Sequence, residues 1–377
     1  MNDTTSHPKT AHTSACPSVV VVGGGYGGIN TAKVLDGIAE VTLVDPTEAF
    51  VHNVASWRAL VEPEWLDRIF LPYDRLLSNG RFVQDRAVAV NGQRVTLASG
   101  EVLEPDYLVL ATGSFYPFPA KTEEPDIASA RERHRAAHDA LVAADRALIL
   151  GAGPAGLELA GEIKAFYPNK HVTIVDIADD ILTGPYDQAL RDELRRQLDL
   201  LGVELYLGRA LTRLPTLPPA TLGAIRVATE DGDELTADIW FRAFGVRPHT
   251  EYLKSGSFAD RRDERGYVRV DEYLRVVGET RVFAVGDIND ADRDMAGVAT
   301  RQAGVVAGNI RALITGQGDL TTWENLPPMI AIPLGPEGGA GFIGDGVADA
   351  ATIAELKGRD MLIGHYAELF DAEPIAS

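Results

Sequence analysis

Two glycine-rich hexapeptides carry the clearest chemical signal in the sequence. Residues 23–28 read GGGYGG and residues 151–156 read GAGPAG, so both have the spacing GxGxxG. In this motif the first glycine permits a tight turn, the second lets the backbone approach a pyrophosphate, and the third lets a helix pack closely on a strand. N–H groups at the start of that helix then bind phosphate oxygens. Both loops are candidate dinucleotide sites, formed by Gly23, Gly24, Gly25, Tyr26, Gly27, Gly28, Gly151, Gly153, Pro154, Ala155 and Gly156.

Each loop is followed by a carboxylate at similar spacing. Asp45 comes 20 residues after Gly25, and Asp176 comes 20 residues after Gly156. A carboxylate at the end of the second strand of such a unit accepts hydrogen bonds from ribose hydroxyls. The four residues after Asp176 include no arginine to receive a 2′-phosphate. The sequence therefore predicts NADH rather than NADPH at the second loop.

A third GxGxxG match, at residues 339–344, has a different context. The chain holds 37 glycines, so a single match arises easily by chance. This match follows Pro333 and a Gly-Pro turn and does not lead into a helix. We therefore expect a hairpin or loop there.

The elements around the first two loops are typical of parallel α/β units. Each loop follows an apolar run, residues 18–22 or 147–150, as expected for a strand buried on both faces. Helices are predicted after the loops at 29–35 and 157–166, and second strands at 41–44 and 172–175. An amphipathic helix follows in the second unit, and Asn-Gly and Asp-Gly pairs at 91–92 and 231–232 predict hairpins.

The chain order predicts an α/β fold with two interleaved Rossmann-like domains. Two dinucleotide sites in one chain indicate FAD plus a nicotinamide nucleotide. The first unit is completed only by the late strand at 282–285, whose end at Gly286 and Asp287 is placed to bond a long cofactor. We expect an FAD-binding domain at 18–122 and 250–320, an NAD(P)H-binding domain at 123–249, a small C-terminal α+β segment at 321–377, and a disordered tail at 1–17.

Composition excludes several functional classes. The net charge of −20 argues against nucleic-acid binding, which needs a positive surface. A single cysteine, Cys16, excludes a disulfide framework, a cysteine-based zinc site and a redox-active cysteine pair, and no metal site is expected. No apolar run is long enough to span a membrane.

These motifs resemble the flavoprotein pyridine-nucleotide-disulfide oxidoreductase superfamily. The resemblance covers about residues 18–310 and is carried by VVVVGGGYGG, VLATGS, LILGAGPAGLELAGE and VFAVGDIND. The stretch AFVHNVASWRALVEP is most similar to the apoptosis-inducing-factor-like branch that includes ferroptosis suppressor proteins; type II NADH:quinone oxidoreductases are more distant. The resemblance implies FAD contacts by the first loop and by Asp45, Arg58, Ala87, Thr112, Gly113, Lys121, Gly286 and Asp287.

The resemblance also implies two candidate catalytic residues. Glu162, on the helix after the second loop, is expected near the nicotinamide, with a surface acid pair with Glu158 as the alternative. His52 is expected near the flavin as a proton donor, with a packed or loop histidine as the alternative. For Arg58 and Lys121 the alternative is a solvated surface cation.

The absence of a cysteine near the first unit points to direct electron transfer from flavin to acceptor. The expected activity is that of an FAD-dependent NAD(P)H:acceptor oxidoreductase with a small acceptor, most simply a quinone. A reductase for a ferredoxin-type protein and an NADH-binding redox sensor are the alternatives; the net charge of −20 disfavours the former, which needs a basic docking patch. We expect a cytoplasmic protein, and leave open peripheral membrane contact and a homodimer.

Overall fold

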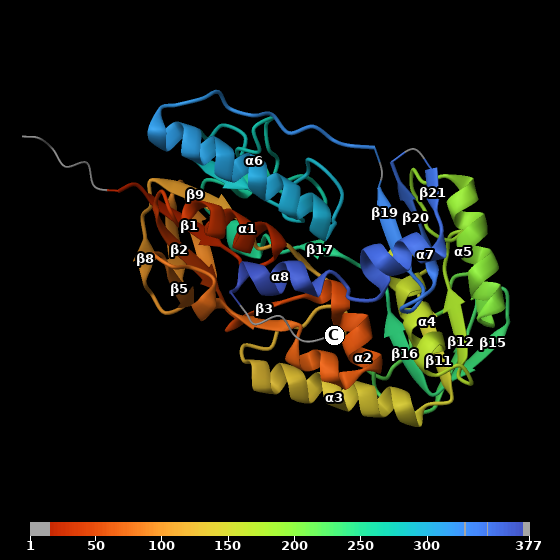
Figure 1. The fold of residues 1–377 in the computed structure, drawn as a ribbon. Helices are drawn as coiled ribbons and strands as arrows, with labels where there is room; N and C mark the ends of the chain where they lie inside the picture. The colour runs from red at the N-terminus through yellow and green to blue at the C-terminus, as the bar shows by residue number, and fades with distance from the viewer. Residues whose placement is uncertain (1–15, 328, 345, 372–377) are drawn as a thin grey trace, which may run out of the picture.

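Two parallel β-sheets organise the chain in the computed structural model, which describes residues 16–327, 329–344 and 346–371 (Figure 1). The first sheet has the order β18-β9-β1-β2-β5 and the second β13-β12-β11-β16, and all neighbouring strands are parallel. The α/β fold class predicted from the sequence is confirmed. The strands are β1 (Ser18–Val22), β2 (Glu40–Asp45), β5 (Arg81–Gln84), β9 (Tyr107–Leu110), β18 (Val282–Ala284), β11 (Arg146–Leu150), β12 (His171–Val175), β13 (Val203–Tyr206) and β16 (Ile239–Arg242).

The first sheet is assembled from segments that lie on both sides of the second in the sequence. Strand β18 pairs with β9, with Val282 opposite Leu108, although the whole second sheet comes between them. The interleaving of the two units is therefore confirmed, while the domain limits at 122 and 250 stay predictions. Of the tail expected at 1–17, residues 1–15 lie outside the described residues.

Helices cover the sheets, and two of them begin inside the glycine motifs. Helix α1 begins at Tyr26 and α4 at Pro154, three residues earlier than predicted, because the last residues of each motif are already helical. Helix α3 was not predicted from the sequence; Asp126 caps it by accepting the N–H of Ser129 at 2.8 Å. The helices are α1 (Tyr26–Leu35), α2 (Ser56–Val61), α3 (Ile127–Ala143), α4 (Pro154–Phe166), α5 (Gln188–Leu200), α6 (Ala296–Thr315), α7 (Ala350–Ile353) and α8 (Ile363–Leu369).

Short antiparallel pairs supply the remaining strands. Hairpins form at both predicted turns, and the third glycine motif is also a hairpin, as expected. The strands are β3 (Ala49–Val51), β4 (Phe70–Pro72), β6 (Ala87–Asn91), β7 (Arg94–Leu97), β8 (Val102–Leu103), β10 (Ser114–Phe115), β14 (Ile225–Ala228), β15 (Glu234–Ala237), β17 (Arg247–Pro248), β19 (Ile330–Pro333), β20 (Gly339–Ile343) and β21 (Gly346–Ala348).

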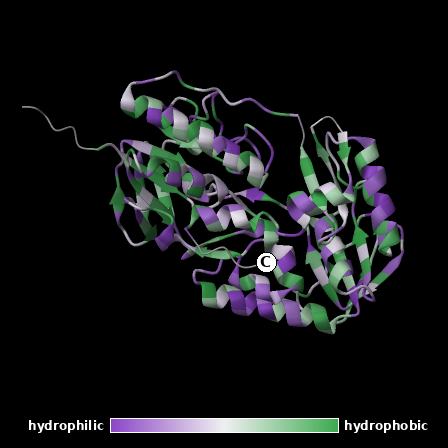
Figure 2. Cartoon of the chain, in the orientation of Figure 1, coloured by the Kyte–Doolittle hydropathy of each residue, from purple (hydrophilic) through white to green (hydrophobic). Residues whose placement is uncertain are grey.

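The C-terminal segment is packed against both units. Strands β19 and β20 lie on α4 and α5, and Ile332 is part of the core of the second unit. Tyr366 and Phe370, in and just after α8, belong instead to the core beneath α1. Hydrophobic residues follow the strands, while α3 and α5 carry hydrophilic residues along much of their length (Figure 2). Within the described residues, none of the helices has the length and apolar character needed to cross a membrane.

Candidate functional site

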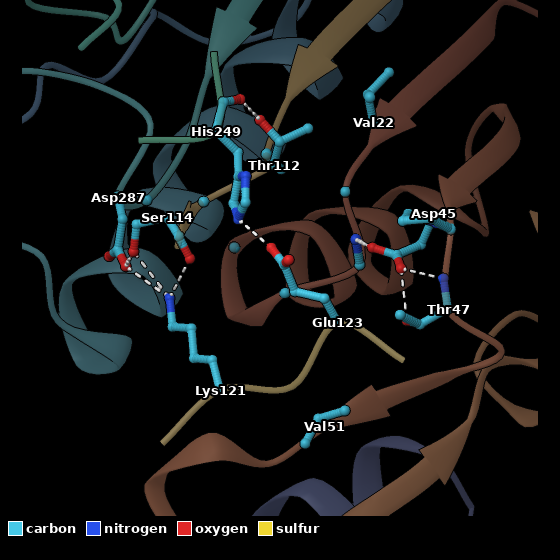
Figure 3. A pocket seen from close by; sticks show the side chains of 18 of the residues that line it. Val22, Asp45, Thr47, Val51, Thr112, Ser114, Lys121, Glu123, His249 and Asp287 are labelled. Carbon is cyan, nitrogen blue, oxygen red and sulfur yellow. Dashed lines mark hydrogen bonds and ion pairs between the residues drawn. The ribbon is translucent and has the colours of Figure 1, made fainter. Parts of the chain in front are cut away.

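A cavity of about 570 Å³ lies at the carboxyl ends of the first sheet (Figure 3). Strands β1, β2, β9 and β18 all end at its wall, which is where parallel sheets bind ligands. The volume is in the range of cofactor sites. Twelve of the residues expected to contact FAD line it: Gly23, Gly24, Gly25, Tyr26, Gly27, Asp45, Ala87, Thr112, Gly113, Lys121, Gly286 and Asp287.

The first glycine loop leaves no room for side chains at its two ends. Gly23 has φ +105°, and a Cβ there would lie 2.4 Å from the carbonyl oxygen of Ala111. A Cβ on Gly28 would lie 1.8 Å from the carbonyl oxygen of Gly23. Gly28 does not line the cavity itself, but its lack of a side chain lets α1 start directly beneath the loop. The N–H groups of the first turn of α1 are therefore held at the cavity wall.

Asp45 holds this loop in place with its carboxylate. One oxygen accepts the N–H of Gly24 at 2.7 Å, and the other accepts the N–H and the hydroxyl of Thr47 at 2.9 and 2.6 Å. Burial raises the pKa of Asp45, while the hydrogen bonds from Thr47 and Gly24 counteract part of that effect. Because Asp45 also lines the cavity, a ribose contact by this carboxylate stays a prediction.

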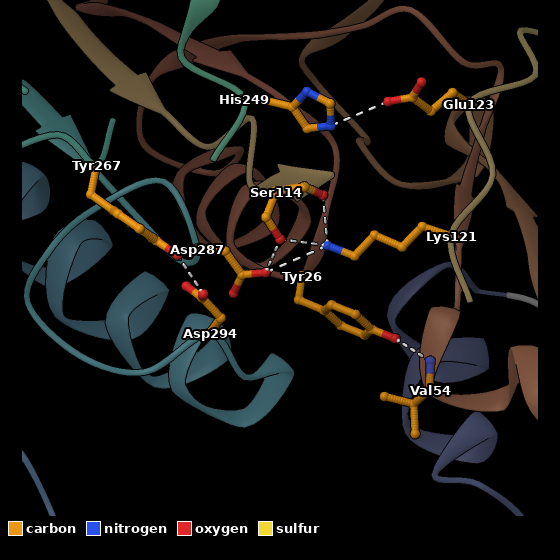
Figure 4. Close-up of polar contacts among 9 residues, drawn as sticks. All are labelled: Tyr26, Val54, Ser114, Lys121, Glu123, His249, Tyr267, Asp287 and Asp294. Carbon is orange, nitrogen blue, oxygen red and sulfur yellow. Dashed lines mark hydrogen bonds and ion pairs between the residues drawn. The ribbon is translucent and has the colours of Figure 1, made fainter. Parts of the chain in front are cut away.

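Lys121 closes the opposite side of the cavity through a network with Ser114 and Asp287 (Figure 4). Its ammonium donates to the carbonyl and hydroxyl oxygens of Ser114 at 2.8 and 2.9 Å, and lies 3.4 Å from Asp287. The Ser114 hydroxyl in turn donates to Asp287 at 2.6 Å. Lys121 is therefore a bound, partly buried cation and not the solvated one considered as the alternative.

A second carboxylate lies close to this network. Asp294 accepts the hydroxyl of Tyr267 at 2.7 Å (Figure 4). Burial, followed by repulsion from Asp287, raises the pKa of Asp294 to about 6. Asp294 therefore accepts a proton more readily than an ordinary aspartate.

Two buried polar atoms on the cavity wall have no partner within the described residues. They are Oδ1 of Asn53 and Oγ1 of Thr122. A buried polar atom without a hydrogen bond is costly, so a ligand with its own polar atoms fits this wall better than an apolar one. FAD, with a ribityl chain, a pyrophosphate and a polar ring edge, meets this requirement.

The structure places Arg58 differently from the expectation. Its guanidinium is 2% exposed and donates to both carboxylate oxygens of Glu162, at 2.7 and 2.9 Å. It also donates to the carbonyl oxygen of Gly358 at 2.9 Å. Arg58 does not line the cavity, because a buried carboxylate and the C-terminal segment take up its donors.

Glu162 lies on α4 with its carboxylate buried against Arg58. Burial raises its pKa, and the guanidinium of Arg58 lowers it in part. Glu158, one turn earlier on α4, accepts the ammonium of Lys357 at 2.7 Å. The alternative of a surface acid pair is wrong for both residues, because each is tied to a cation. A contact of Glu162 with nicotinamide stays a prediction.

His52 does not line the cavity, although its chain neighbours Val51 and Asn53 do. Its Nε2 donates to the carbonyl oxygen of Met361 at 2.6 Å, so its Nδ1 accepts the hydroxyl of Tyr26 at 3.1 Å. The Tyr26 hydroxyl also accepts the N–H of Val54 at 3.0 Å. Burial lowers the pKa of His52 to about 4. The structure therefore does not bring His52 to the cavity: it is a packed, neutral histidine that orients Tyr26, which does line it.

The second glycine loop repeats the geometry of the first. Gly151 has φ +115°, and a Cβ on Gly156 would lie 1.9 Å from the carbonyl oxygen of Gly151. Asp176 accepts the N–H of Ala152 at 2.6 Å and the N–H of Ala178 at 2.8 Å. Helix α4 begins at Pro154, after Gly153 as its N-cap residue.

Several cavity residues were missed by the sequence reasoning. They include Glu123 and His249: the carbonyl oxygen of His249 accepts the hydroxyl of the expected residue Thr112 at 2.7 Å, and the His249 ring faces Glu123 at 3.3 Å (Figure 3). These residues come from short connections between elements, so no periodicity or motif singles them out. The two-residue strand β10, which carries Ser114, pairs with β17 from the end of the second unit and brings His249 alongside.

Known sequences resemble the whole chain. A family model described as pyridine nucleotide-disulphide oxidoreductase matches residues 17–303. Human ferroptosis suppressor protein 1 is 31% identical over 353 residues, which are 92% of this chain and 93% of that protein. Apoptosis-inducing factor homolog A of Dictyostelium discoideum is 29% identical over 380 residues, 95% of this chain and 93% of that protein.

Solved structures share the fold. The sulfide:quinone oxidoreductase of Aquifex aeolicus has a TM-score of 0.75 at 18% identity, covering 94% of this chain and 92% of that one. NDH2 of Plasmodium falciparum, solved in complex with NADH, has a TM-score of 0.74 at 12% identity, covering 94% of this chain and 95% of that one. At these identities the likeness establishes the arrangement of the elements.

Proposed function

Since this chain belongs to the pyridine nucleotide-disulphide oxidoreductase family, we propose that it oxidises NADH through bound FAD and reduces a quinone or similar small acceptor. The family implies FAD and NAD(P)H as the two nucleotides. The observation that carries the proposal is the pair of matching glycine loops, one of which opens on a cavity of about 570 Å³.

The residues of that cavity suit FAD. The first loop and the start of α1 would hold the pyrophosphate, while Lys121, Ser114 and Asp287 would meet the polar middle of the cofactor. Asn53 and Thr122 offer buried polar atoms that need a partner. Bound FAD supplies the exchange between two-electron hydride chemistry and electron transfer to an acceptor. The protein's own residues orient the nucleotides, with Tyr26 held by His52.

Electron transfer without a thiol is supported by the cavity wall. Cys16 is the one cysteine of the chain, and it is exposed on the far side of β1, with its sulfur 3.7 Å from the carbonyl oxygen of Ile38. The residues that line the cavity include no cysteine. An acceptor therefore receives electrons directly from the flavin in this proposal.

NADH is the proposed donor because of the charges beside the second loop. Asp176 would repel a 2′-phosphate, and it is fixed by two backbone N–H groups. Arg195 does reach this edge from α5, but its guanidinium is bound by Asp180 at 2.6 Å. A higher kcat/KM for NADPH than for NADH would contradict this preference.

Two observations support a quinone as the acceptor: the net charge of the chain and the similarity to a quinone-dependent enzyme. The net charge of −20 disfavours an acidic protein partner. One structural relative is by its name a sulfide:quinone oxidoreductase, with a TM-score of 0.75. A small uncharged acceptor that enters the cavity fits both observations.

Two half-reactions test the proposal. Holoenzyme is first mixed with NADH without oxygen, and bleaching of the visible flavin absorbance is expected. Water-soluble quinones, ferricyanide, oxygen and cytochrome c are then added separately, and quinones are expected to restore the absorbance fastest. Bleached flavin that no quinone reoxidises would reject the quinone acceptor, and flavin that NADH does not bleach would reject the activity as a whole.

A further inference from the structure

Arg242 is a cation at the ligand-binding edge of the second sheet that the proposed function has not used. It ends β16, directly beside β11, and its register partner Leu150 immediately precedes the second glycine loop. A Cβ on Gly151 would lie 2.6 Å from the carbonyl oxygen of Ala243, so the chain just after Arg242 packs against the loop itself. In Figure 1, β16 and β11 lie side by side with α4 next to them.

The guanidinium of Arg242 has not been neutralised by the protein. Its Nε is buried and has no hydrogen-bond partner within the part of the chain that the structure describes. Other arginines of this unit are paired: Arg146 with Asp238 and Arg195 with Asp180, both at 2.6 Å. A buried donor on a permanent cation calls for an anionic acceptor.

The neighbouring residues hold this guanidinium in a fixed place. It lies over the ring of Phe244, 4.5 Å from the ring centroid. A Cβ on Gly245 would lie 2.6 Å from its Nη2, so the glycine leaves room for the charged end. The loop 243–245 therefore positions Arg242 without satisfying its hydrogen bonds.

Arg242 also lies toward the FAD cavity. Tyr116 lines that cavity, and burial raises its pKa, an effect increased by Glu158 and reduced by the positive charge of Arg242. Glu158 is itself paired with Lys357 at 2.7 Å. The charge of Arg242 therefore acts on the side of the FAD cavity that Tyr116 lines.

We propose that Arg242 binds the pyrophosphate of the nicotinamide dinucleotide, at the phosphate nearer the nicotinamide. The strand order β12-β11-β16 supports this placement. Asp176, which would face the adenine ribose, directly follows β12 on one side of the loop, and Arg242 ends β16 on the other. Neighbouring strands are about 4.8 Å apart, so these two side chains flank the loop from opposite sides.

The identity of the ligand in this inference rests on the proposed function. The position of Arg242 also excludes a role in recognising the 2′-phosphate of NADPH. An arginine that reads the 2′-phosphate of NADPH has to lie beside the adenine ribose, next to Asp176. Arg242 lies across β11 from that position. It therefore strengthens binding of NADH and NADPH alike.

The test compares two hydride donors, one with a pyrophosphate and one without. NADH is compared with 1-benzyl-1,4-dihydronicotinamide, which has neither ribose nor phosphate, in the holoenzyme and its Arg242→Gln and Arg242→Lys variants. Loss of a charge-assisted hydrogen bond is expected to lower kcat/KM for NADH by about tenfold to hundredfold in Arg242→Gln. Reduction by the benzyl compound should be unchanged, and Arg242→Lys should recover part of the loss.

Arg226→Gln is the matched control, because it removes the same charge from the exposed hairpin β14–β15. It should leave both donors unaffected. Equal effects of Arg242→Gln on both donors, or no effect on NADH, would overturn the proposal. So would a change in the NADH:NADPH preference.

Binding of ADP-ribose, measured by calorimetry, separates this inference from the proposed activity. ADP-ribose keeps the pyrophosphate and transfers no hydride. Weaker binding by Arg242→Gln supports the contact even if NADH is not oxidised, and unchanged binding overturns it even if NADH is oxidised.

Discussion

The two glycine loops are nearly identical in backbone geometry and yet face different surroundings. In both, a Cβ on the third glycine would lie within 1.9 Å of the carbonyl oxygen of the first. In both, an aspartate 20 residues after a motif glycine accepts the N–H of the motif's second residue, at 2.7 Å for Asp45 and 2.6 Å for Asp176. Local sequence therefore makes the same phosphate cradle twice.

The difference lies in what the rest of the chain brings to each loop. The first loop opens on a cavity closed by Lys121, Ser114 and Asp287. The second leads into a helix whose two acids are already bound, Glu158 by Lys357 and Glu162 by Arg58. The motif therefore fixes the geometry of each loop, while distant segments decide how deeply the space in front of the loop is enclosed.

The largest expected effect comes from adding one methyl group to either loop. Gly28→Ala and Gly156→Ala both place a Cβ under 2 Å from a carbonyl oxygen, so the helix must shift. Overpacking of about 1–3 kcal/mol should weaken nucleotide binding by about fivefold to hundredfold. Gly28→Ala should lose FAD, measured by the flavin-to-protein absorbance ratio. Gly156→Ala should keep FAD and lose rapid reduction by NADH.

Gly37→Ala serves as the control, because a Cβ there would meet nothing within 4 Å. It should retain both FAD and the NADH reaction. Identical losses from Gly28→Ala and Gly156→Ala would break the assignment of one nucleotide to each loop.

After these losses of nucleotide binding, the largest expected effect on the stability of the fold concerns the buried pair beside the second loop. Arg58→Met leaves the Glu162 carboxylate buried without its cation, and Glu162→Gln leaves Arg58 with only the more distant Glu62 carboxylate, at 3.7 Å. Each should lower the free energy of unfolding by about 3–5 kcal/mol, measured with urea, and Arg58→Met/Glu162→Leu should recover much of it. An FAD loss specific to Arg58→Met would show instead that Arg58 contacts the cofactor.

Two buried histidines predict a pH dependence of stability. Burial lowers the pKa of His52 and His134 to about 4, below the ordinary 6.5. Their folded-state pKa is depressed, so the unfolded chain takes up protons first and stability falls as pH drops from 6.5 toward 4. Each histidine should account for roughly 3 kcal/mol of that loss.

His134→Leu isolates one of the two contributions. His134 has no hydrogen-bond partner for either ring nitrogen within the described residues, and it packs against Phe70 and Phe118. The variant should unfold at higher urea concentration at pH 5 than the parent protein and should leave FAD content unchanged. Parallel pH curves for the two proteins would contradict the assignment.

The smallest expected effect is at Thr122, whose hydroxyl is buried on the cavity wall and has no hydrogen-bond partner among the residues that the structure describes. Thr122→Val should stabilise the FAD-free protein slightly, because a costly buried donor is removed. It should raise the Kd for FAD about fivefold, since one hydrogen bond of about 1 kcal/mol is lost. Tighter FAD binding would show that the cofactor does not reach this hydroxyl.

Local chemistry explains which parts were predictable from the sequence. Both loops, Asp45 and Asp176 are held by contacts within one β-turn-α-β unit, so motif spacing was sufficient to find them. The positions of Arg58 and His52 depend on carbonyl oxygens of Gly358 and Met361, about 300 residues further along. A local pattern contains no information on such contacts.

Helix α3 and Arg242 show two other reasons why a feature of the structure was not predicted from the sequence. Only four of the 17 residues of α3 are buried, so its apolar pattern is weak, and Asp126 was its one clear signal. Arg242 ends β16, which pairs in parallel with β11, a pairing that was not predicted from the sequence. The pairing partner, and with it the position at the ligand edge, was absent from the sequence pattern.

The late pairing of β18 with β9 sets an order of events during synthesis of the chain. As residues leave the ribosome, all four strands of the second sheet emerge before β18, so that sheet can close while the first still has β9 as an open edge. Helix α6 and then Tyr366 and Phe370 arrive later still to complete the core beneath α1. The nascent protein can therefore complete its second sheet first, while the cavity at the first sheet is complete only after nearly the whole chain has been made.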